Sequence, residues 1–180
     1  FLMKLNLDAI LKNPEAFVKA NVTLPRFDVI QMRKLTADQP EWVHFGAGNI
    51  FRGFIGSIAQ KLLDEGYSKT GIIACETFDY DIIDKIYNPF DNFTLNVLMN
   101  ADGTTSRQIS ASIAEAIKAD FSCEDSLKRL KEVFTSPTLK MVSFTITEKG
   151  YQLKRTDGTL LPVVESDMNE GPHKARHAMS

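Results

Sequence analysis

Short apolar runs alternate with amphipathic segments along much of the chain. Three runs predict buried strands, at 42–45, 72–75 and 140–147. Between them, segments 50–65 and 124–134 place their apolar residues on one helical face. Strands that alternate with helices form mostly parallel sheets, because each crossover helix packs against a face of the sheet. The pattern therefore predicts an α/β fold with a doubly wound, mostly parallel sheet.

Two β-hairpins are expected to interrupt this alternation. One spans 93–110, where apolar and polar positions alternate on both sides of a turn sequence at 100–103. The other is centred on Asp157-Gly158, with strands expected at 151–155 and 159–163. Such insertions add strands without excluding a doubly wound sheet.

The remaining segments are assigned less uniformly. Residues 7–20 have a helical pattern with a break at Asn13-Pro14-Glu15, and 21–40, which contain Pro, Asp and Thr, are expected to be a surface lead-in. A short helix is predicted at 79–86, because Asn-Pro follows it. Residues 113–118 fit either a strand or a helix.

The first predicted strand runs directly into a Gly-x-Gly turn and then a helix. In a dinucleotide-binding unit of the Rossmann type, the first glycine permits a tight turn and the second lets a pyrophosphate approach the backbone. The usual third glycine is replaced here by Phe51, which is expected to fill the space between strand and helix. The alternative is a purely structural turn. The candidate cofactor-binding residues of this loop are Gly46, Ala47, Gly48, Asn49, Ile50, Phe51 and Arg52.

Acidic and polar residues end the next strands of the predicted sheet. Glu76 closes the second strand, where a carboxylate can accept hydrogen bonds from both ribose hydroxyls and would repel a 2′-phosphate, which favours NAD over NADP. Asp79 and Asp81 are alternatives for this role. Thr147 and Glu148 follow the last strand and are further candidates for cofactor binding, the alternative being an ordinary polar loop.

Composition and charge exclude several classes of function. A formal net charge of −2 and the absence of a basic stripe argue against a nucleic-acid partner. No apolar run is long enough to cross a bilayer, so no membrane partner is expected.

Cys75 and Cys123 are expected to be free core thiols in a reducing cytoplasm. His44 is expected to be a core histidine. His173 and His177 would share a helix face, but without a third ligand no metal site is predicted.

The ends of the chain point to a larger protein. The chain begins with Phe1, and 173–179 resembles the start of a helix rather than a stop. We expect an N-terminal helical lead-in over 1–40 and an NAD-binding domain over 41–180, followed in the whole protein by a further domain.

Two motifs resemble the mannitol dehydrogenase family, the polyol-specific long-chain dehydrogenases. His44–Ile50 followed by Arg52–Gly56 is similar to the family's cofactor loop, and Thr145–Tyr151 is similar to its second recognisable segment. The 112–116 stretch also fits, and the resemblance extends over roughly 41–180. An aromatic residue before the arginine resembles the branch of the family that acts on non-phosphorylated substrates, closest to the mannonate/fructuronate type.

The resemblance implies reversible hydride transfer between NAD(H) and a polyol or sugar acid, a reaction of carbohydrate metabolism. Family members carry a catalytic lysine, with asparagine and histidine nearby, on a helical C-terminal domain that this chain lacks. No catalytic residue is therefore assigned here, Lys149 included, and the chain alone is expected to be inactive. Its expected partners are the small-molecule substrate and that C-terminal domain.

Other functions remain open at this point. Within the family, the alternatives are a mannitol or mannitol-1-phosphate dehydrogenase. From other classes, they are an S-adenosylmethionine-dependent methyltransferase and a non-catalytic nucleotide-binding module. A methyltransferase also has a glycine loop after its first strand and an acid after its second, although its loop is usually richer in glycine.

Overall fold

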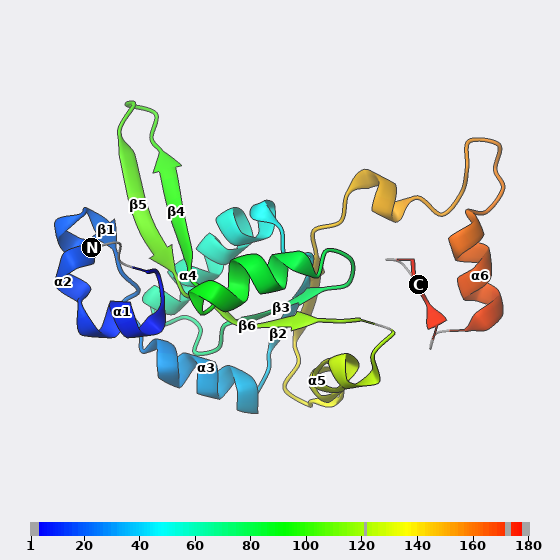
Figure 1. Cartoon of the computed structure of the whole chain (residues 1–180), viewed down its shortest axis with the longest axis horizontal. Helices are drawn as coiled ribbons and strands as arrows, with labels where there is room; N and C mark the ends of the chain where they lie inside the picture. Colours follow the sequence, from blue (N-terminus) through cyan, green and yellow to red (C-terminus); the bar gives the residue numbers. More distant parts are fainter. Residues whose placement is uncertain (1–3, 121, 172–173, 178–180) are drawn as a thin grey trace.

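A parallel four-stranded sheet forms the centre of the computed structural model, which describes residues 4–120, 122–171 and 174–177. Its strands are β2 (Trp42–Phe45), β3 (Ile72–Glu76), β6 (Ile113–Lys118) and β7 (Met141–Phe144). They lie in the order β6-β3-β2-β7, with every pair parallel (Figure 1). The chain therefore adds β3 and then β6 on one side of β2, and crosses back to place β7 on the other side. This confirms the predicted doubly wound sheet and puts its switch point between β2 and β7.

Helical segments cover both faces of this sheet. The connection from β2 to β3 is formed by η1 (Phe51–Ile55) and α4 (Gly56–Asp64), and β3 is followed by η2 (Ile83–Tyr87) and η3 (Asn88–Phe90). The helix α5 (Glu124–Thr135) joins β6 to β7.

The strands bury side chains on both of their faces, as parallel strands between helices do. On β3, Ile72 and Ala74 pack in one cluster with residues of η1, α4 and η2. Ile73 and Cys75 point to the opposite face and pack in a second cluster, which includes Val133 of α5. The apolar runs of the sequence predicted these strands for this reason.

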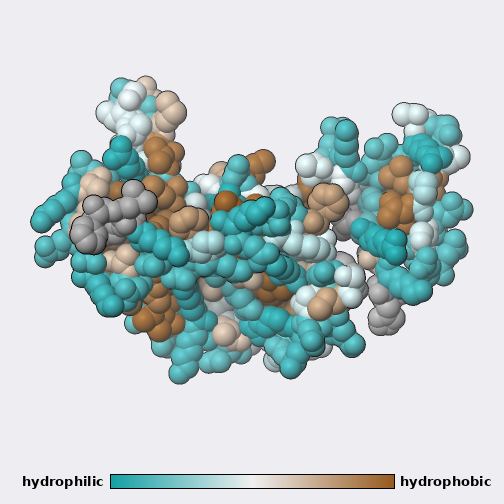
Figure 2. Space-filling view, in the orientation of Figure 1, coloured by the Kyte–Doolittle hydropathy of each residue, from teal (hydrophilic) through white to brown (hydrophobic). Residues whose placement is uncertain are grey.

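A second, smaller sheet carries the first predicted hairpin. Its strands are β1 (Val22–Thr23), β5 (Thr105–Ser110) and β4 (Thr94–Met99), with β4 and β5 antiparallel. The hairpin projects from the body of the molecule (Figure 1). Figure 2 shows apolar side chains gathered along its lower part, where β4 exposes Leu95 and Val97. The segment 113–118, for which the sequence left strand and helix open, is the strand β6, and the chain enters it almost directly from β5.

The prediction of a surface lead-in at 21–40 is wrong. This stretch contains β1 and the helix α3 (Val29–Asp38), which buries Met32 and Thr36. Together with α1 (Leu7–Lys12) and α2 (Pro14–Lys19), α3 packs into a core cluster that includes Ile109 of β5. Sequence reasoning missed α3 because Thr36, a polar residue, occupies a core position, where its hydroxyl donates to the Met32 carbonyl.

The strands predicted for the second hairpin are not formed at full length, although its turn and a short antiparallel pairing are present. One bridge, Lys154 to Leu160, connects the two segments around Gly158, and the Leu161 amide donates to the Leu153 carbonyl at 3.0 Å. Pro162 begins the helix α6 (Pro162–Glu170), because its fixed backbone angle suits the first turn of a helix. The segment before the turn begins in the short helix η4 (Glu148–Tyr151). The last predicted strand is confirmed but ends at Phe144. The helix start predicted at 173–179 lies partly outside the described residues.

Within the described part of the chain, no helix is long and apolar enough to cross a membrane.

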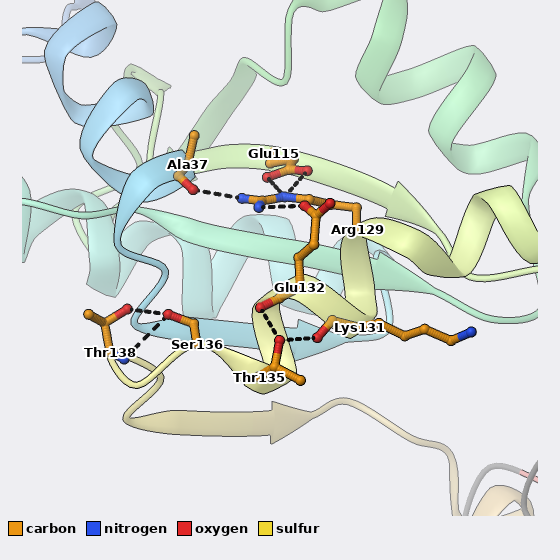
Figure 3. Close-up of polar contacts among 8 residues, drawn as sticks. All are labelled: Ala37, Glu115, Arg129, Lys131, Glu132, Thr135, Ser136 and Thr138. Carbon is orange, nitrogen blue, oxygen red and sulfur yellow. Dashed lines mark hydrogen bonds and ion pairs between the residues drawn. The ribbon is translucent and has the colours of Figure 1, made fainter.

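One arginine joins three elements of the fold. Figure 3 shows Arg129 reaching from α5 toward β6 and the end of α3. Its Nε lies 2.9 Å from Glu115 Oε1, and its Nη2 donates to the Ala37 carbonyl at 3.1 Å. The bridge to Glu115 raises the pKa of Arg129. The same guanidinium thus fixes α5 to the sheet and binds a carbonyl near the C-terminus of α3.

We expect Arg129→Ala to lower the free energy of unfolding by about 1 to 2 kcal/mol, because a charge-assisted bridge and a helix-end contact are lost together. Urea denaturation followed by circular dichroism measures this change. Lys128→Ala, which replaces an exposed residue of the same helix, is the control and should change it by less than about 0.5 kcal/mol. Equal losses in the two variants would contradict the role of Arg129.

Candidate functional site

The two glycines of the loop after β2 have different structural roles. Gly46 has φ +101°, and a Cβ there would lie 2.7 Å from the Thr145 carbonyl oxygen. Its amide donates to the Cys75 carbonyl at 2.9 Å, which continues the pairing with β3 past the end of the strand. At Gly48, by contrast, a Cβ would meet nothing within 4 Å. Gly46 is therefore required by the fold, whereas Gly48 leaves open space above the backbone.

The helix after the loop begins at Asn49, and its first amides have no acceptor within the helix. Asn49 and Ile50 are exposed, whereas Ala47 and Phe51 are fully buried. Asn49 and Ile50 are therefore the residues of this turn that face solvent, whereas Ala47 and Phe51 pack in the core. This arrangement gives an open glycine, exposed neighbours and the positive end of a helix dipole, which together suit an anion.

Phe51 fills the space that a third glycine would leave between strand and helix, as predicted. Its ring stacks on His44 with centroids 4.1 Å apart and planes 4° from parallel. The close approach of helix to sheet occurs five residues later, at Gly56, after the π-helical segment η1. There a Cβ would lie 3.6 Å from Ser112 Oγ and 4.0 Å from Ile113 Cδ1 of β6, and Ser112 Oγ donates to the Gly56 carbonyl at 2.7 Å.

Glu76, at the end of β3, contacts the glycine loop directly. Its Oε2 accepts from the Ala47 amide at 3.0 Å, and its Oε1 accepts from the Thr77 amide at 3.0 Å. The alternative acids do not make this contact. Asp79 is exposed, and Asp81 pairs with Lys85 at 2.5 Å on the surface. Glu76 is thus the acid that the fold places beside the loop.

Arg52 bends back beneath the loop instead of extending into solvent. Its Nη1 donates to the Ala47 carbonyl at 2.9 Å, its Nη2 donates to Asn49 Oδ1, and its Cζ lies 5.7 Å from the centre of the Tyr87 ring. Tyr87, in η2, also donates to the Ala47 carbonyl at 2.9 Å. Sequence reasoning missed Tyr87, because nothing in its local pattern connects it with a loop forty residues earlier.

A row of hydrogen bonds follows the seam between β2 and β7 to the same loop. Trp42 Nε1 donates to Ser143 Oγ at 2.7 Å, and His44 lies between Ser143 Oγ at 2.7 Å and Thr145 Oγ1 at 3.0 Å. Thr145 Oγ1 then donates to the Gly46 carbonyl at 3.2 Å. All donors and acceptors match when His44 is neutral with its proton on Nε2.

His44 is therefore the satisfied core histidine that the sequence predicted. Burial lowers its pKa to about 4. Ser143 and Thr145 were not singled out as site residues, although Thr145 lies inside the second motif. The sequence feature that could have identified them is a polar side chain at alternate positions of an otherwise apolar strand.

Thr147 and Glu148 lie beyond the end of β7. Thr147 accepts a hydrogen bond from the Gly150 amide at 2.8 Å, and Glu148 begins η4. Among the described residues, no hydrogen bond joins either of them to the glycine loop. The structure brings Thr145 to the loop instead, so the assignment of Thr147 and Glu148 stays a prediction.

The two cysteines and His177 lie in different surroundings. Burial raises the pKa of Cys75 to about 12, so its thiol stays protonated. Both cysteines are free, but Cys123 is exposed, and the prediction of two core thiols is wrong for Cys123. His177 Nε2 lies 3.2 Å from the Gln152 carbonyl, and His173 lies outside the described residues. Over the described ranges, no group of three or more His, Cys, Asp or Glu could hold a metal ion.

The parallel sheet, with its glycine loop beside the switch point and an acid at the end of β3, defines a Rossmann-type α/β unit. No family model matches the chain. D-mannonate oxidoreductase of Thermotoga maritima is 46% identical over 177 residues, which are 98% of this chain and 32% of that protein. The uncharacterized oxidoreductase YdfI of Escherichia coli is 28% identical over 169 residues, 89% of this chain and 32% of that protein.

Two solved structures share the fold. Mannitol 2-dehydrogenase of Pseudomonas fluorescens, in a ternary complex with NAD and D-mannitol, superposes with a TM-score of 0.73 over 98% of this chain and 34% of that one, at 23% identity. Substrate-free D-sorbitol dehydrogenase superposes with a TM-score of 0.68 over 88% of this chain and 32% of that one, also at 23% identity.

Over the region that it spans, the chain belongs to the mannitol dehydrogenase family. It corresponds to the N-terminal part of these relatives and spans about a third of their length.

The lowered pKa of His44 predicts a loss of stability in acid. Above pH 6.5, the usual pKa of histidine, His44 is neutral in both folded and unfolded chains and its contribution is constant. Below that pH the unfolded chain binds a proton at His44 that the folded chain does not bind. The free energy of unfolding therefore falls by about 3 kcal/mol by pH 4. Urea denaturation at pH 7 and at pH 4.5 measures the loss. His44→Gln should lose less stability over this interval, and an identical loss in both proteins would contradict the prediction.

Proposed function

We propose that this chain is the NAD-binding part of an oxidoreductase that transfers a hydride between NAD(H) and a polyol or sugar acid, of the mannonate/fructuronate type. The observation that carries the proposal is the loop from Gly46 to Arg52, where an open glycine and the start of a helix lie beside an acidic strand end. The 46% identity to D-mannonate oxidoreductase supports the reaction class, as does the fold shared with an NAD-bound mannitol 2-dehydrogenase.

In this proposal each part of the loop meets one part of the cofactor. The pyrophosphate lies over Gly48, where its charge faces the amides of Gly48, Asn49 and Ile50. Glu76 faces the adenosine ribose and accepts hydrogen bonds from its hydroxyls, while its hydrogen bond from the Ala47 amide is retained. Thr147 and Glu148 lie on the nicotinamide side. NAD supplies the hydride chemistry when bound, and the residues of this chain bind and orient it.

The substrate and the proton-transfer group belong to the rest of the protein in this proposal. A lysine on a C-terminal domain removes the hydroxyl proton of the substrate, so the present chain alone is inactive. We further propose that residues 41–180 carry the cofactor site and that residues 1–40 support it from the N-terminal side.

Gly48→Ala tests the position of the pyrophosphate. The new methyl group meets nothing within 4 Å, so the fold should persist, but it occupies the space above the loop. We expect NAD affinity to fall by about tenfold or more, measured by calorimetric titration. Gly53→Ala is the matched control, because its added methyl also meets nothing within 4 Å and residue 53 is outside the loop from Gly46 to Arg52. Equal NAD affinity in the two variants would contradict the proposed position.

Glu76→Gln tests the contact with the ribose. The substitution removes the charge but keeps one accepting oxygen for the Ala47 amide. We expect the preference for NAD over NADP to fall by about tenfold, because the repulsion of a 2′-phosphate is lost. Asp79→Asn, which neutralises an exposed acid on the same connection, is the control and should leave the preference unchanged. Titration of the unaltered chain with S-adenosylmethionine belongs in the same series, and binding of that ligand in place of NAD would overturn the proposal.

A further inference from the structure

The Ala47 carbonyl is the most heavily bonded acceptor of the loop. It accepts hydrogen bonds from Tyr87 Oη at 2.9 Å and from Arg52 Nη1 at 2.9 Å. Tyr87 is 1% exposed and lies in the apolar cluster with Phe51 and Ile83. A buried phenol needs a hydrogen-bond partner, and here the partner is a main-chain atom of the candidate cofactor loop.

The orientation of this carbonyl determines the orientation of the next amide. In a trans peptide the C=O and the N–H point in opposite directions, and the described chain has no cis peptide bond. Because the Ala47 carbonyl is held toward the core, the Gly48 N–H points away from the core. The preceding peptide is held as well, since Thr145 Oγ1 donates to the Gly46 carbonyl and Glu76 accepts from the Ala47 amide.

Tyr87 is the better fixed of the two donors. Arg52 is only half-buried and also binds the exposed side chain of Asn49, so its guanidinium can shift with solvent or ligand. The Tyr87 ring is enclosed on all sides, and burial raises the pKa of its hydroxyl, which therefore stays a donor at any physiological pH. Its position in η2, after β3, connects the loop to a part of the chain outside both sequence motifs.

We propose that Tyr87 is a positioning residue that turns the Gly48 amide toward the pyrophosphate of the cofactor by holding the Ala47 carbonyl. The inference rests on the proposed NAD site, and it adds a residue that the glycine fingerprint does not contain. It acts on the phosphate part of the ligand and not on the adenosine part.

Tyr87→Phe tests this role, because it removes one hydroxyl and keeps the buried ring. The probes are NADH, ADP and adenosine, with ADP and adenosine measured by displacement of NADH fluorescence. We expect the affinity for ADP to fall by about fivefold, as for one lost hydrogen bond, while the affinity for adenosine stays within about twofold. The amide resonance of Gly48 in a ¹⁵N spectrum should also move, which loss of stability alone would not cause.

Tyr80→Phe is the matched control. The Tyr80 hydroxyl also donates to main-chain carbonyls, of Thr77 at 3.1 Å and of Ala119 at 3.3 Å, but not to the glycine loop. This variant should leave both the ratio of ADP to adenosine affinity and the Gly48 resonance unchanged.

The outcomes separate the two levels of the proposal. If the unaltered chain binds none of the three probes, the NAD site fails and this inference fails with it. If the unaltered chain binds and Tyr87→Phe has the same ratio of ADP to adenosine affinity, only the role of Tyr87 is overturned. The role of Tyr87 is also overturned if Tyr80→Phe changes that ratio as much as Tyr87→Phe does.

A thermal melt followed by circular dichroism shows whether Tyr87→Phe is folded. If it is not, the Gly48 resonance of the unaltered chain is followed instead while ADP and, separately, adenosine are added. A Gly48 amide that responds no more to ADP than to adenosine would overturn the inference.

Discussion

The contact between Gly46 and the end of β7 is the constraint on which the rest of the site depends. β2 is paired on both sides up to its end. Just past β2 the Gly46 amide donates to the Cys75 carbonyl of β3, and just past β7 the Thr145 amide donates to the Phe45 carbonyl. With 2.7 Å between a Cβ position and the Thr145 carbonyl, no larger residue fits between these chains. The backbone must therefore turn at Gly46, and this turn starts the helix beside the switch point of the sheet.

The absence of a third glycine is compensated within the same helix. Phe51 occupies the position of the third glycine, and its ring stacks on His44. A phenylalanine ring needs more room between strand and helix than a glycine does. The helix widens into the π-helical segment η1 and then approaches the sheet at Gly56, where Ser112 Oγ donates to the Gly56 carbonyl. An aromatic ring at the fingerprint position, a widened turn and a displaced glycine are thus one solution to a single packing problem. His44 belongs to it too, because its flat ring, held by Ser143 and Thr145, provides the stacking surface.

The sequence predicted the parts of the molecule that depend on local pattern. The apolar runs predicted the parallel strands, because such strands are buried on both faces, and the glycines predicted the loop. It failed where contacts between distant segments decide the structure. Thr36 lies in the core because its hydroxyl serves the Met32 carbonyl and the Gly71 amide, a partner thirty-five residues away. Tyr87 contributes to the loop for the same kind of reason, through a hydrogen bond to a carbonyl forty residues earlier in the chain.

The ionisation states around the loop distinguish binding from proton transfer. His44 in β2 and Cys75 in β3 are titratable groups buried near the ends of these strands, and burial holds both uncharged, with pKa values of about 4 and about 12. A general base for a hydroxyl substrate needs a pKa nearer to the working pH, so neither group is suited to that task. What the loop offers is fixed amides and one carboxylate already bound to the Ala47 amide. Such groups recognise a charged ligand and determine its orientation, and the proton chemistry of the proposed reaction must then come from residues outside this loop.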